Sequence, residues 1–516
     1  MAPLRFCRNI NFLWASTESK IHRAFNRSIT TSTVSSKKYE EAPPKNPAER
    51  SIFALKKGLQ RLKKRLDDPN NEYPELTKAE KFRSFPTATD VLVIGAGAMG
   101  SSVAYWLKEE AGDALDVLVI DKDFSVMEDV SRLSEYAKAS TVLSVGGVRQ
   151  QFSLPENIKM SLFGAEFLQN IEHYLSIPNE FTPNIQFQPD GYLFLATEKS
   201  AHILEQNSKL QWELGAKNEL LTPAKLKKKF PWINTEGICL GCHGLRNEGW
   251  FDPWTLLQAF KSKAMYYGAK FYEGEVIHFQ FDEQVIAECH HTGERHPALE
   301  KAYIKIGPDE IKEVQFAICV ICAGPESGRL AKLAGVGSGA GVRSIELPIV
   351  PRKRYVFTYR CPDGPSLNCP LTVDPSGVYF RREGFGNLYL AGLSPEPHEE
   401  PNPENLEVDY EWFDEKIWPQ IAKRAPCFEN IKLLNAWAGY YETNLFDENG
   451  FVGLAPSHSN LYIAAGFSGH GIQQSPAVGR AIMELIMYHK FIKIDLERLS
   501  PERILLNKPI YESNIV

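Results

Sequence analysis

Two apolar segments separated by a glycine-rich turn constrain the fold of this chain more than any other feature. Residues 90–94 (Asp-Val-Leu-Val-Ile) lead directly into Gly-Ala-Gly-Ala-Met-Gly at 95–100. Helical periodicity follows over 102–107, and a second apolar segment at 116–121 ends in an aspartate. A strand, a glycine turn, a helix and a second strand make up the βαβ unit of dinucleotide-binding folds. The pattern therefore predicts an α/β domain that binds a dinucleotide.

Each position of this unit predicts a contact. Gly95 permits the tight turn, Gly97 lets the backbone approach a pyrophosphate, and Gly100 allows the helix to pack closely on the strand. The N-terminus of the helix offers free N–H groups to phosphate oxygens. Asp121 follows Gly100 by 21 residues, where a carboxylate can bind a ribose hydroxyl. The neighbouring residues predicted to belong to the same site are Ala96, Met99 and Lys122.

A second glycine loop near the other end of the chain favours a flavin over a nicotinamide. Residues 461–465 (Leu-Tyr-Ile-Ala-Ala) are typical of a strand, and Gly-Phe-Ser-Gly-His-Gly follows at 466–471. We expect a helix to start at Pro476 with Ser475 as its N-cap, which would create a second anion site. A flavin needs one such site for its pyrophosphate and another for the charge that develops on reduction.

The charge of the chain is distributed unevenly. Residues 1–85 carry 18 Lys and Arg against 9 Asp and Glu, and because the whole chain carries −6, the remainder carries −15. An acidic body does not match the phosphates of nucleic acid, so we expect no nucleic-acid partner. The nearest candidate for a membrane span, the uncharged segment 91–107, is too short and too rich in Gly and Ser to cross a bilayer.

Residues 1–36 have the composition of a targeting sequence. They contain five basic residues against one acid, with a Ser- and Thr-rich stretch at 28–36. This Arg- and Ser-rich, acid-poor pattern predicts a mitochondrial transit peptide, with a basic tail of no targeting function as the alternative. Residues 37–87 are predicted to be a linker containing a basic amphipathic helix at 51–66. That helix would lie on the inner membrane, dock on a partner, or pack on its own domain.

Three motifs in order along the chain carry a resemblance to a known family. They are the glycine turn at 95–100, the segment Ala-Ile-Cys-Val-Ile-Cys-Ala-Gly at 317–324 and the glycine loop at 466–471. With them, roughly residues 88–505 resemble the D-amino-acid oxidase / sarcosine oxidase family of FAD-dependent amine dehydrogenases and oxidases.

The resemblance implies the fold class. It predicts an α/β two-domain flavoprotein, with a Rossmann-like FAD-binding domain and a substrate domain built on a mixed or antiparallel β-sheet. The FAD-binding domain would comprise 88–187, 249–344 and 441–505, and the substrate domain 188–248 and 345–440.

The resemblance also implies site residues. Val276 would meet the adenine, Ala323 and Gly324 would close over the cofactor, and an arginine, Arg149, would bind a substrate carboxylate. The other positions assigned to FAD are Ser144, Gly466, Gly469, His470, Gly471, Ile472 and Gln473. The other positions assigned to the substrate are Tyr379, Arg381 and Tyr440, with Arg382 and Tyr441 as alternatives.

Departures from the family pattern carry information too. Residues 437–443 contain no cysteine, although sarcosine oxidases attach FAD covalently to one there, and no histidine follows Ser140-Thr141 as in dimethylglycine dehydrogenases. These differences predict noncovalent FAD. Gln473 stands where sarcosine oxidases have a lysine, which argues against sarcosine or glycine as the substrate. Two Cys-x-x-Cys pairs lie too far apart, at 239–242 and 319–322, to predict a metal site.

Four further segments, 144–155, 351–356, 379–384 and 437–441, resemble one mitochondrial branch of the family, whose members assist assembly of respiratory complex I. This resemblance implies a location in the matrix, with possible peripheral contact to the inner membrane, and complex I subunits or assembly intermediates as partners. The alternative is a working mitochondrial dehydrogenase for a small amine or amino acid. The branch resemblance favours the assembly role, and the intact nucleotide motifs favour FAD in both cases.

Overall fold

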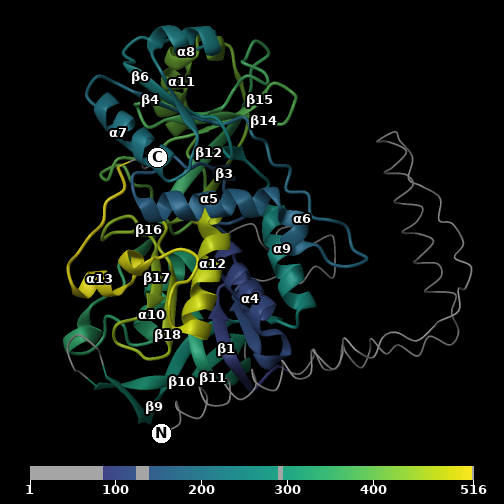
Figure 1. The fold of residues 1–516 in the computed structure, drawn as a ribbon, viewed down its shortest axis with the longest axis vertical. Helices are drawn as coiled ribbons and strands as arrows, with labels where there is room; N and C mark the ends of the chain where they lie inside the picture. The colour runs from purple at the N-terminus through teal and green to yellow at the C-terminus, as the bar shows by residue number, and fades with distance from the viewer. Residues whose placement is uncertain (1–84, 124–138, 289–294, 309, 514–516) are drawn as a thin grey trace, which may run out of the picture. The chain divides into compact units, whose positions relative to one another are not determined.

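The computed structural model describes residues 85–123, 139–288, 295–308 and 310–513 (Figure 1). The predicted transit peptide, the linker and the basic helix at 51–66 all lie outside the described residues. Residues 86–516 form one unit, which contains both glycine loops. No helix among the described residues is both long enough and apolar enough to cross a membrane.

The first sheet carries both glycine loops. Its strands, in spatial order, are β17 (Phe451–Leu454), β18 (Leu461–Ala465), β11 (Glu310–Ile321), β1 (Ala88–Ile94), β2 (Val117–Asp121) and β8 (Lys270–Glu273). The five strands from β18 to β8 are parallel, and β17 pairs antiparallel with β18. The hairpin of β9 (Glu275–Glu288) and β10 (Arg295–Ile306) extends from β11. The centre of the sheet is a continuous apolar run, because a parallel strand is covered on both faces; Val91, Leu92 and Val93 are fully buried.

Helices α4 (Ala98–Ala111), α9 (Pro253–Tyr266) and α12 (Gly471–Tyr488) pack beside one another along this sheet, and α5 (Pro155–Gln169) crosses the end of α12 (Figure 1). Each glycine loop leads into one of them, the first into α4 and the second into α12. The two helices approach closely at Gly479, where an added Cβ would lie 2.2 Å from the Ser102 hydroxyl. The βαβ unit expected from the sequence is therefore present, and both loops lie on one layered body.

Helix α12 begins earlier than its sequence suggested. We expected it to start at Pro476, but it starts at Gly471 and contains Pro476 in its interior. Proline has no N–H to donate to the carbonyl of Ile472, four residues back. The hydroxyl of Ser475 donates to that carbonyl instead, at 2.9 Å. Ser475 thus replaces the missing backbone bond inside the helix rather than capping its end.

The second sheet is mixed, as the family resemblance implied. Its strands, in spatial order, are β16 (Lys432–Asn444), β12 (Ile349–Arg360), β15 (Leu388–Gly392), β14 (Tyr379–Glu383), β13 (Leu371–Val373), β4 (Tyr192–Ala196), β6 (Leu240–Gly244) and β5 (Asn218–Leu221). All neighbours pair antiparallel except β13 and β4. Strand β16 runs to Asn444, four residues past the predicted end of the substrate domain at 440.

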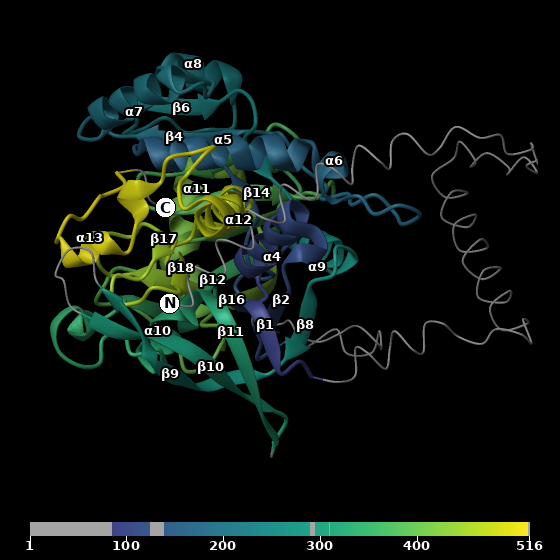
Figure 2. The ribbon, with the colours of Figure 1, turned by 60° about the horizontal axis from the view of Figure 1, so that its bottom comes forward.

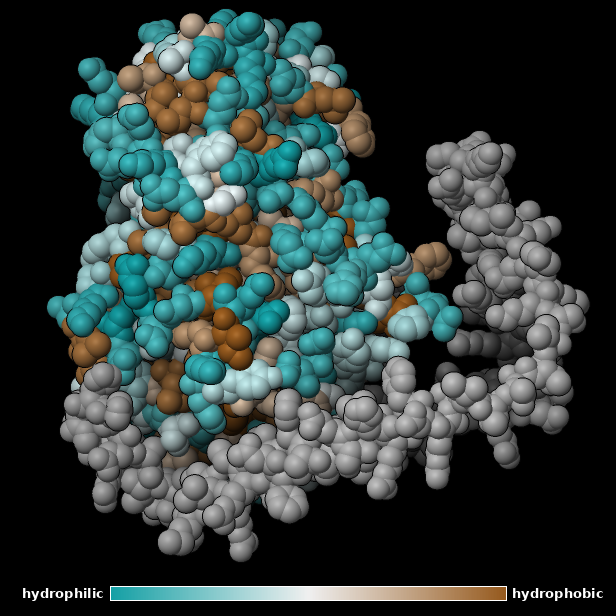
Figure 3. Space-filling view, in the orientation of Figure 1, coloured by the Kyte–Doolittle hydropathy of each residue, from teal (hydrophilic) through white to brown (hydrophobic). Residues whose placement is uncertain are grey.

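Helices cover the outer face of this second sheet. Helices α7 (Ala201–Glu213) and α8 (Pro223–Lys229) pack on β5 and β6, and Figure 2 shows them together at one end of the unit. Helix α11 (Trp418–Arg424) covers an aromatic core that includes Phe357, Tyr359 and Phe428. On the face shown in Figure 3, hydrophobic residues of the described part form scattered patches between hydrophilic ones.

The last described residues, 506–513, are held by hydrogen bonds to the loop after β16 and to the start of α5. The carbonyl of Ile510 accepts from the Asn449 amide at 2.8 Å, next to the buried ion pair of Asp447 and Arg503. Farther along, the carboxylate of Glu512 accepts from the backbone N–H groups of Ser153, at 2.6 Å, and of the following leucine, at 3.2 Å. These are free N–H groups at the start of α5, so Glu512 serves as their cap.

Candidate flavin site

A cavity of about 820 Å³ lies where the carboxyl ends of β1 and β11 face the second sheet. Ligands of parallel α/β sheets usually bind at this end of the strands. Most of the residues predicted from the sequence line it. They are Gly95, Gly97, Met99, Asp121, Lys122, Ser144, Arg149, Val276, Ala323, Gly324, Tyr379, Tyr440, Gly469, His470, Gly471, Ile472 and Gln473. Ala96, Gly100, Gly466 and Arg381 are not among the lining residues.

The first glycine loop brings backbone to the cavity wall. Gly95 has φ +104°, and a Cβ there would lie 2.4 Å from the carbonyl oxygen of Cys322 on the adjacent chain segment. Gly100 packs so closely that a Cβ would lie 1.8 Å from the carbonyl oxygen of Gly95. Gly97 is the N-cap of α4 and itself lines the cavity. Gly100 thus does not line the cavity. It allows the close packing of helix on strand for which the motif requires a glycine.

The acid at the end of β2 stabilises this loop. The carboxylate of Asp121 accepts from the N–H of Ala96 at 2.6 Å and from that of Asp123 at 3.0 Å. Ala96 is therefore held at the site although it does not line the cavity. Thr141, which the sequence analysis passed over, accepts from the N–H of Ala98 at the start of α4, at 3.1 Å. No motif marks a threonine 43 residues away as a partner of this helix.

The second glycine loop lies at the opposite wall. Gly469 has φ +94°, and a Cβ there would lie 2.1 Å from the hydroxyl oxygen of Tyr441. His470 caps the start of α12, and burial, with the nearby charge of Arg149 second, lowers its pKa to about 3. Its ring is therefore neutral, and its Nε2 has no hydrogen-bond partner among the described residues. Gly466 has φ +84° and is not among the residues that line the cavity.

Arg149 lies beside the second loop, close to His470 and Gln473. Its guanidinium lies 4.2 Å from the ring centroid of Phe152 and 5.1 Å from that of Phe194, and it donates to the carbonyl of Gln151 at 3.1 Å. Its backbone N–H donates to the side chain of Gln473 at 2.7 Å. Gln473 therefore fixes the arginine segment to α12. A buried guanidinium on a cavity wall is suited to an anionic group such as a carboxylate.

The predicted arginine pair on β14 does not reach the cavity. The guanidinium of Arg381 donates to the carbonyl of Val145 at 2.9 Å and pairs with Glu383, and that of Arg382 pairs with Asp190. Both lie near the ring of Trp250. The expectation that Arg381 binds substrate finds no support in this geometry, because other groups of the protein already hold its guanidinium away from the cavity.

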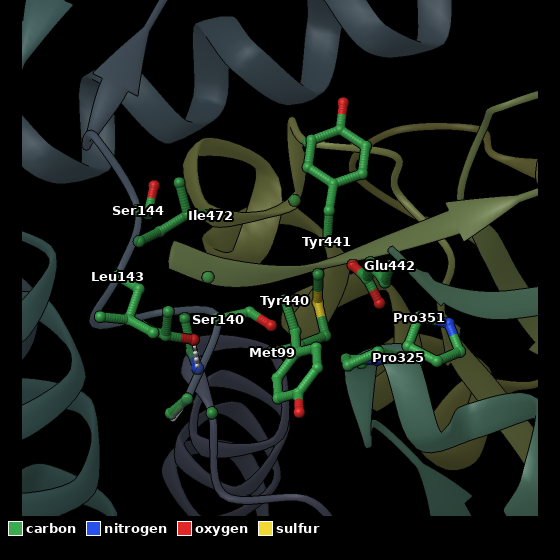
Figure 4. A pocket seen from close by; sticks show the side chains of 18 of the residues that line it. Met99, Ser140, Leu143, Ser144, Pro325, Pro351, Tyr440, Tyr441, Glu442 and Ile472 are labelled. Atoms are coloured by element: carbon green, nitrogen blue, oxygen red, sulfur yellow. Dashed lines mark hydrogen bonds between the residues drawn. The ribbon is translucent and has the colours of Figure 1, made fainter. Parts of the chain in front are cut away.

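Strand β16 supplies four consecutive lining residues, Gly439, Tyr440, Tyr441 and Glu442. Tyr440 and Tyr441 point to opposite sides of the strand (Figure 4), and the Tyr441 hydroxyl donates to the carbonyl of Ser468. The carboxylate of Glu442 accepts from the N–H groups of Gly466, at 3.0 Å, and Phe467, at 3.3 Å. Burial raises the pKa of this carboxyl to about 7. The sequence analysis did not select Glu442, because one acid inside an apolar and aromatic strand carries no motif.

This arrangement fits FAD. The bare backbone at Gly95 and Gly97 leaves room for a pyrophosphate at the start of α4, and the start of α12 offers a second polar end at the far wall. The unpartnered Nε2 of His470 marks a place where a bound group can complete a hydrogen bond. No group of three His, Cys, Asp or Glu within 85–123, 139–288, 295–308 and 310–513 could hold a metal ion.

Comparison with known proteins identifies the family. The model of the DAO family, described as FAD dependent oxidoreductase, matches residues 90–485. The chain belongs to the DAO family of FAD-dependent oxidoreductases. The match spans both glycine loops and both sheets, and the family assignment confirms the resemblance drawn from the motifs.

The DAO relatives include close and distant proteins. The chain is 49% identical to FAD-dependent oxidoreductase domain-containing protein 1 of Bos taurus, over 80% of this chain and 84% of the bovine protein. It is 45% identical to the homologue in Drosophila melanogaster, over 84% of this chain and 82% of the fly protein. Monomeric sarcosine oxidase of an Arthrobacter strain is 21% identical, over 78% of this chain and 93% of that enzyme.

Solved DAO-like structures share the fold. L-proline dehydrogenase from P. horikoshii superposes with a TM-score of 0.67 at 24% identity, over 83% of this chain and all of the other. Glycine oxidase from Geobacillus kaustophilus superposes with a TM-score of 0.63 at 18% identity, over 81% and 99%. These comparisons confirm the predicted fold class. Membership of this family of FAD-dependent oxidoreductases indicates that this chain binds FAD.

Proposed function

We propose that this chain holds FAD noncovalently and oxidises a carbon–nitrogen bond of a small amine or amino acid. The observation that carries the proposal is the single cavity that runs from the glycine loops to the buried Arg149. FAD supplies the acceptor for the hydride equivalent that leaves the carbon next to nitrogen. The protein contributes an anion-binding guanidinium, a neutral His470 and a wall of tyrosines that excludes water.

Noncovalent attachment is supported by the residues on β16. Residues 437–443 place Tyr440, Tyr441 and Glu442 at the cavity, and none of these is a cysteine or histidine that could bond to a flavin carbon. Acid precipitation should release the flavin completely into the supernatant, with protein-bound colour absent from the pellet. A yellow pellet would contradict noncovalent binding.

Arg149→Lys is expected to weaken the response to amino-acid substrates selectively. Lysine keeps the charge but loses the planar fork that binds a carboxylate with two bonds. Because hydrogen bonds to charged groups contribute about 1.5–3 kcal/mol, the concentration of amino acid that half-saturates anaerobic flavin bleaching should rise by about 10- to 100-fold. The panel should contain N-methyl amino acids, proline-like imino acids and the matching amines without a carboxylate.

This experiment has two controls, a set of amines without a carboxylate and the variant Arg381→Lys. Amines without a carboxylate should respond equally in the wild type and in Arg149→Lys. Arg381→Lys should leave the bleaching curves unchanged, because Arg381 is held by Val145 and Glu383 outside the cavity. If Arg381→Lys and Arg149→Lys exchanged these effects, the assignment of the substrate guanidinium would be wrong. If no compound of the panel bleached the flavin, the case for turnover would be lost.

We also propose that the biological role is in assembly of respiratory complex I in the mitochondrial matrix, with peripheral contact to the inner membrane. The support is the composition of residues 1–36 and the resemblance of four segments, 144–155, 351–356, 379–384 and 437–441, to the mitochondrial branch of the family. This role and amine oxidation can belong to the same protein, because a fold does not decide between them.

Depletion of the chain from cells tests the second proposal. Native gels should show less complete complex I and more of its subassemblies, and a tagged chain should recover complex I subunits from matrix extracts. Rescue by wild type and by Arg149→Lys separates the two roles: equal rescue indicates that assembly does not need turnover. Normal complex I after depletion, or a tagged chain outside mitochondria, would contradict the proposal.

A further inference from the structure

Glu442 is an acid on the wall of the FAD cavity with an unusual set of neighbours. Its side chain is part-buried, and the hydrogen bonds to its carboxylate come from the backbone N–H groups of Gly466 and Phe467. The positions beside it are glycines: a Cβ at Gly324 would lie 3.7 Å from one carboxylate oxygen, and a Cβ at Gly471 3.3 Å from the other. The carboxylate therefore lies at open backbone between the second glycine loop and the turn at Gly324; Figure 4 shows it among the residues that line the cavity.

The cations near Glu442 are engaged elsewhere. On the neighbouring strand β12, its register partner is Pro351, and the nearby Arg352 and Arg354 both pair with Glu400. The 3₁₀ turn Gly324–Glu326 contributes another acid rather than a base. That acid, Glu326, pairs with Arg329 at 2.7 Å and with Lys122 at 3.4 Å.

The remaining groups that face Glu442 are neutral near pH 7. On the segment after β11, burial raises the pKa of the Cys322 thiol well above its ordinary value. At the start of α12, the pKa of His470 is lowered to about 3. On β16 itself, burial raises the pKa of Tyr441 to about 12, and α4 presents the apolar Met99. Within the described part of the chain, the groups that stabilise a charge on Glu442 are thus two backbone N–H dipoles, those of Gly466 and Phe467.

We propose that Glu442 is an acid of the cofactor site that carries a proton when FAD is bound. FAD brings a doubly negative pyrophosphate into the cavity that Glu442 lines. In a confined, weakly screened site, two like charges disfavour each other strongly. Binding therefore combines protein with ionised Glu442, FAD and one proton from solvent to give the complex with the neutral carboxylic acid. No covalent bond to the flavin forms and no electron moves in this step.

The proposal predicts that FAD binds more weakly as the pH rises. The pKa of Glu442 without FAD is about 7, so the proton is already in place at pH 5.5 and FAD affinity there should not change with pH. Above pH 7 the proton must be taken from solvent, and the dissociation constant should rise by up to tenfold for each pH unit. The rise should stop once pH exceeds the pKa of Glu442 in the complex.

Proton uptake by the wild-type protein tests the proposal directly. The full chain, freed of FAD, is titrated with FAD in weakly buffered solution containing a pH indicator. At pH 8 we expect uptake approaching one proton per FAD bound, and at pH 5.5 none. An infrared difference spectrum of binding at pH 8 should gain the carbonyl band of a protonated carboxylic acid. Binding at pH 8 without proton uptake would overturn the proposal.

Two variants assign the proton to its residue. Glu442→Gln should bind FAD with the same dissociation constant from pH 6 to 9 and take up no proton at pH 8. Glu404→Gln removes another carboxylate that lines the cavity, on an exposed loop, and should behave as wild type. Loss of proton uptake in Glu404→Gln, or its persistence in Glu442→Gln, would overturn the assignment. If Glu442→Gln fails to fold, the infrared band and the proton uptake of the wild-type protein still show whether a carboxylate is protonated when FAD binds.

The inference rests on FAD binding and not on turnover. A wild-type chain that binds no FAD at any pH would refute the cofactor itself. A chain that binds FAD with equal affinity from pH 6 to 9 would refute only the role of Glu442. An inactive chain that shows the proton uptake would leave the inference standing and contradict amine oxidation.

Discussion

Purified Gly100→Ala is expected to contain almost no flavin. The new Cβ would lie 1.8 Å from the carbonyl oxygen of Gly95 and 3.2 Å from the side chain of Val93. The nearest group is backbone of the glycine loop itself, so it cannot rotate aside like a side chain. Either α4 or the loop must move, and both form the predicted pyrophosphate site. Overpacking of this kind costs about 1–3 kcal/mol, which would raise the dissociation constant for FAD by about 5- to 150-fold.

The measurement is the ratio of flavin to protein absorbance, followed by titration of the flavin-free protein with FAD. Gly386→Ala is the matched control, because the nearest atom to its Cβ is a side-chain carbon of Leu388 at 4.0 Å. It should retain wild-type flavin content. Far-ultraviolet circular dichroism should show that both variants are folded. A folded Gly100→Ala protein with full flavin content would show that this close approach does not shape the site.

Asp447→Ala is expected to destabilise the protein by about 3–5 kcal/mol, the typical cost of removing one partner of a buried ion pair. Asp447 is 1% exposed, and its carboxylate pairs with Arg503 through bonds of 2.7 and 2.9 Å. It also accepts from the Asn444 amide and from the backbone N–H of Ile510. The variant leaves a guanidinium in the interior without its counter-charge, and it removes the group that joins β16 to the C-terminal segment.

Urea unfolding at a fixed FAD concentration measures this loss, because bound ligand adds its own stabilisation. The control is Glu346→Ala, which breaks an exposed ion pair with Lys332 whose side chains are 70% and 67% exposed. Exposed pairs of this kind contribute no more than about 1 kcal/mol. A similar urea midpoint for the two variants would mean that loss of the Asp447–Arg503 pair does not lower the free energy of unfolding.

The parts of the site that depend on short-range geometry could be predicted from the sequence. Gly95 and Gly97 line the cavity because the requirement for a bare backbone is met within one turn and is visible as a motif. The two-domain fold was implied by the family resemblance that these motifs carry. The roles of Thr141 and Glu442 depend on chain segments that meet only in the folded protein, and neither residue belongs to a motif.

Two expectations failed for physical reasons that the sequence does not display. The family resemblance implied that Arg381, or Arg382 in its place, would bind the substrate, but neither residue lines the cavity and both guanidinium groups find partners inside the protein. The start of α12 was misplaced because proline usually marks the first turn of a helix, whereas the Ser475 hydroxyl compensates for it inside this one. Both errors involve polar groups satisfied by neighbours that sequence patterns do not specify.

Residues 510–512 complete a hydrogen-bond cluster that joins the start of α5 to the loop after β16. Glu512 accepts from the backbone N–H of Ser153, four residues after Arg149, and from the Asn157 amide, which also donates to Asn449, while the carbonyl of Ile510 accepts from the Asn449 amide. A nonsense codon that deletes just the last seven residues would therefore spare every strand of both sheets and still loosen the segment that presents the anion-binding guanidinium. Affinity tags for this protein should accordingly be separated from Ser513 by a generous spacer.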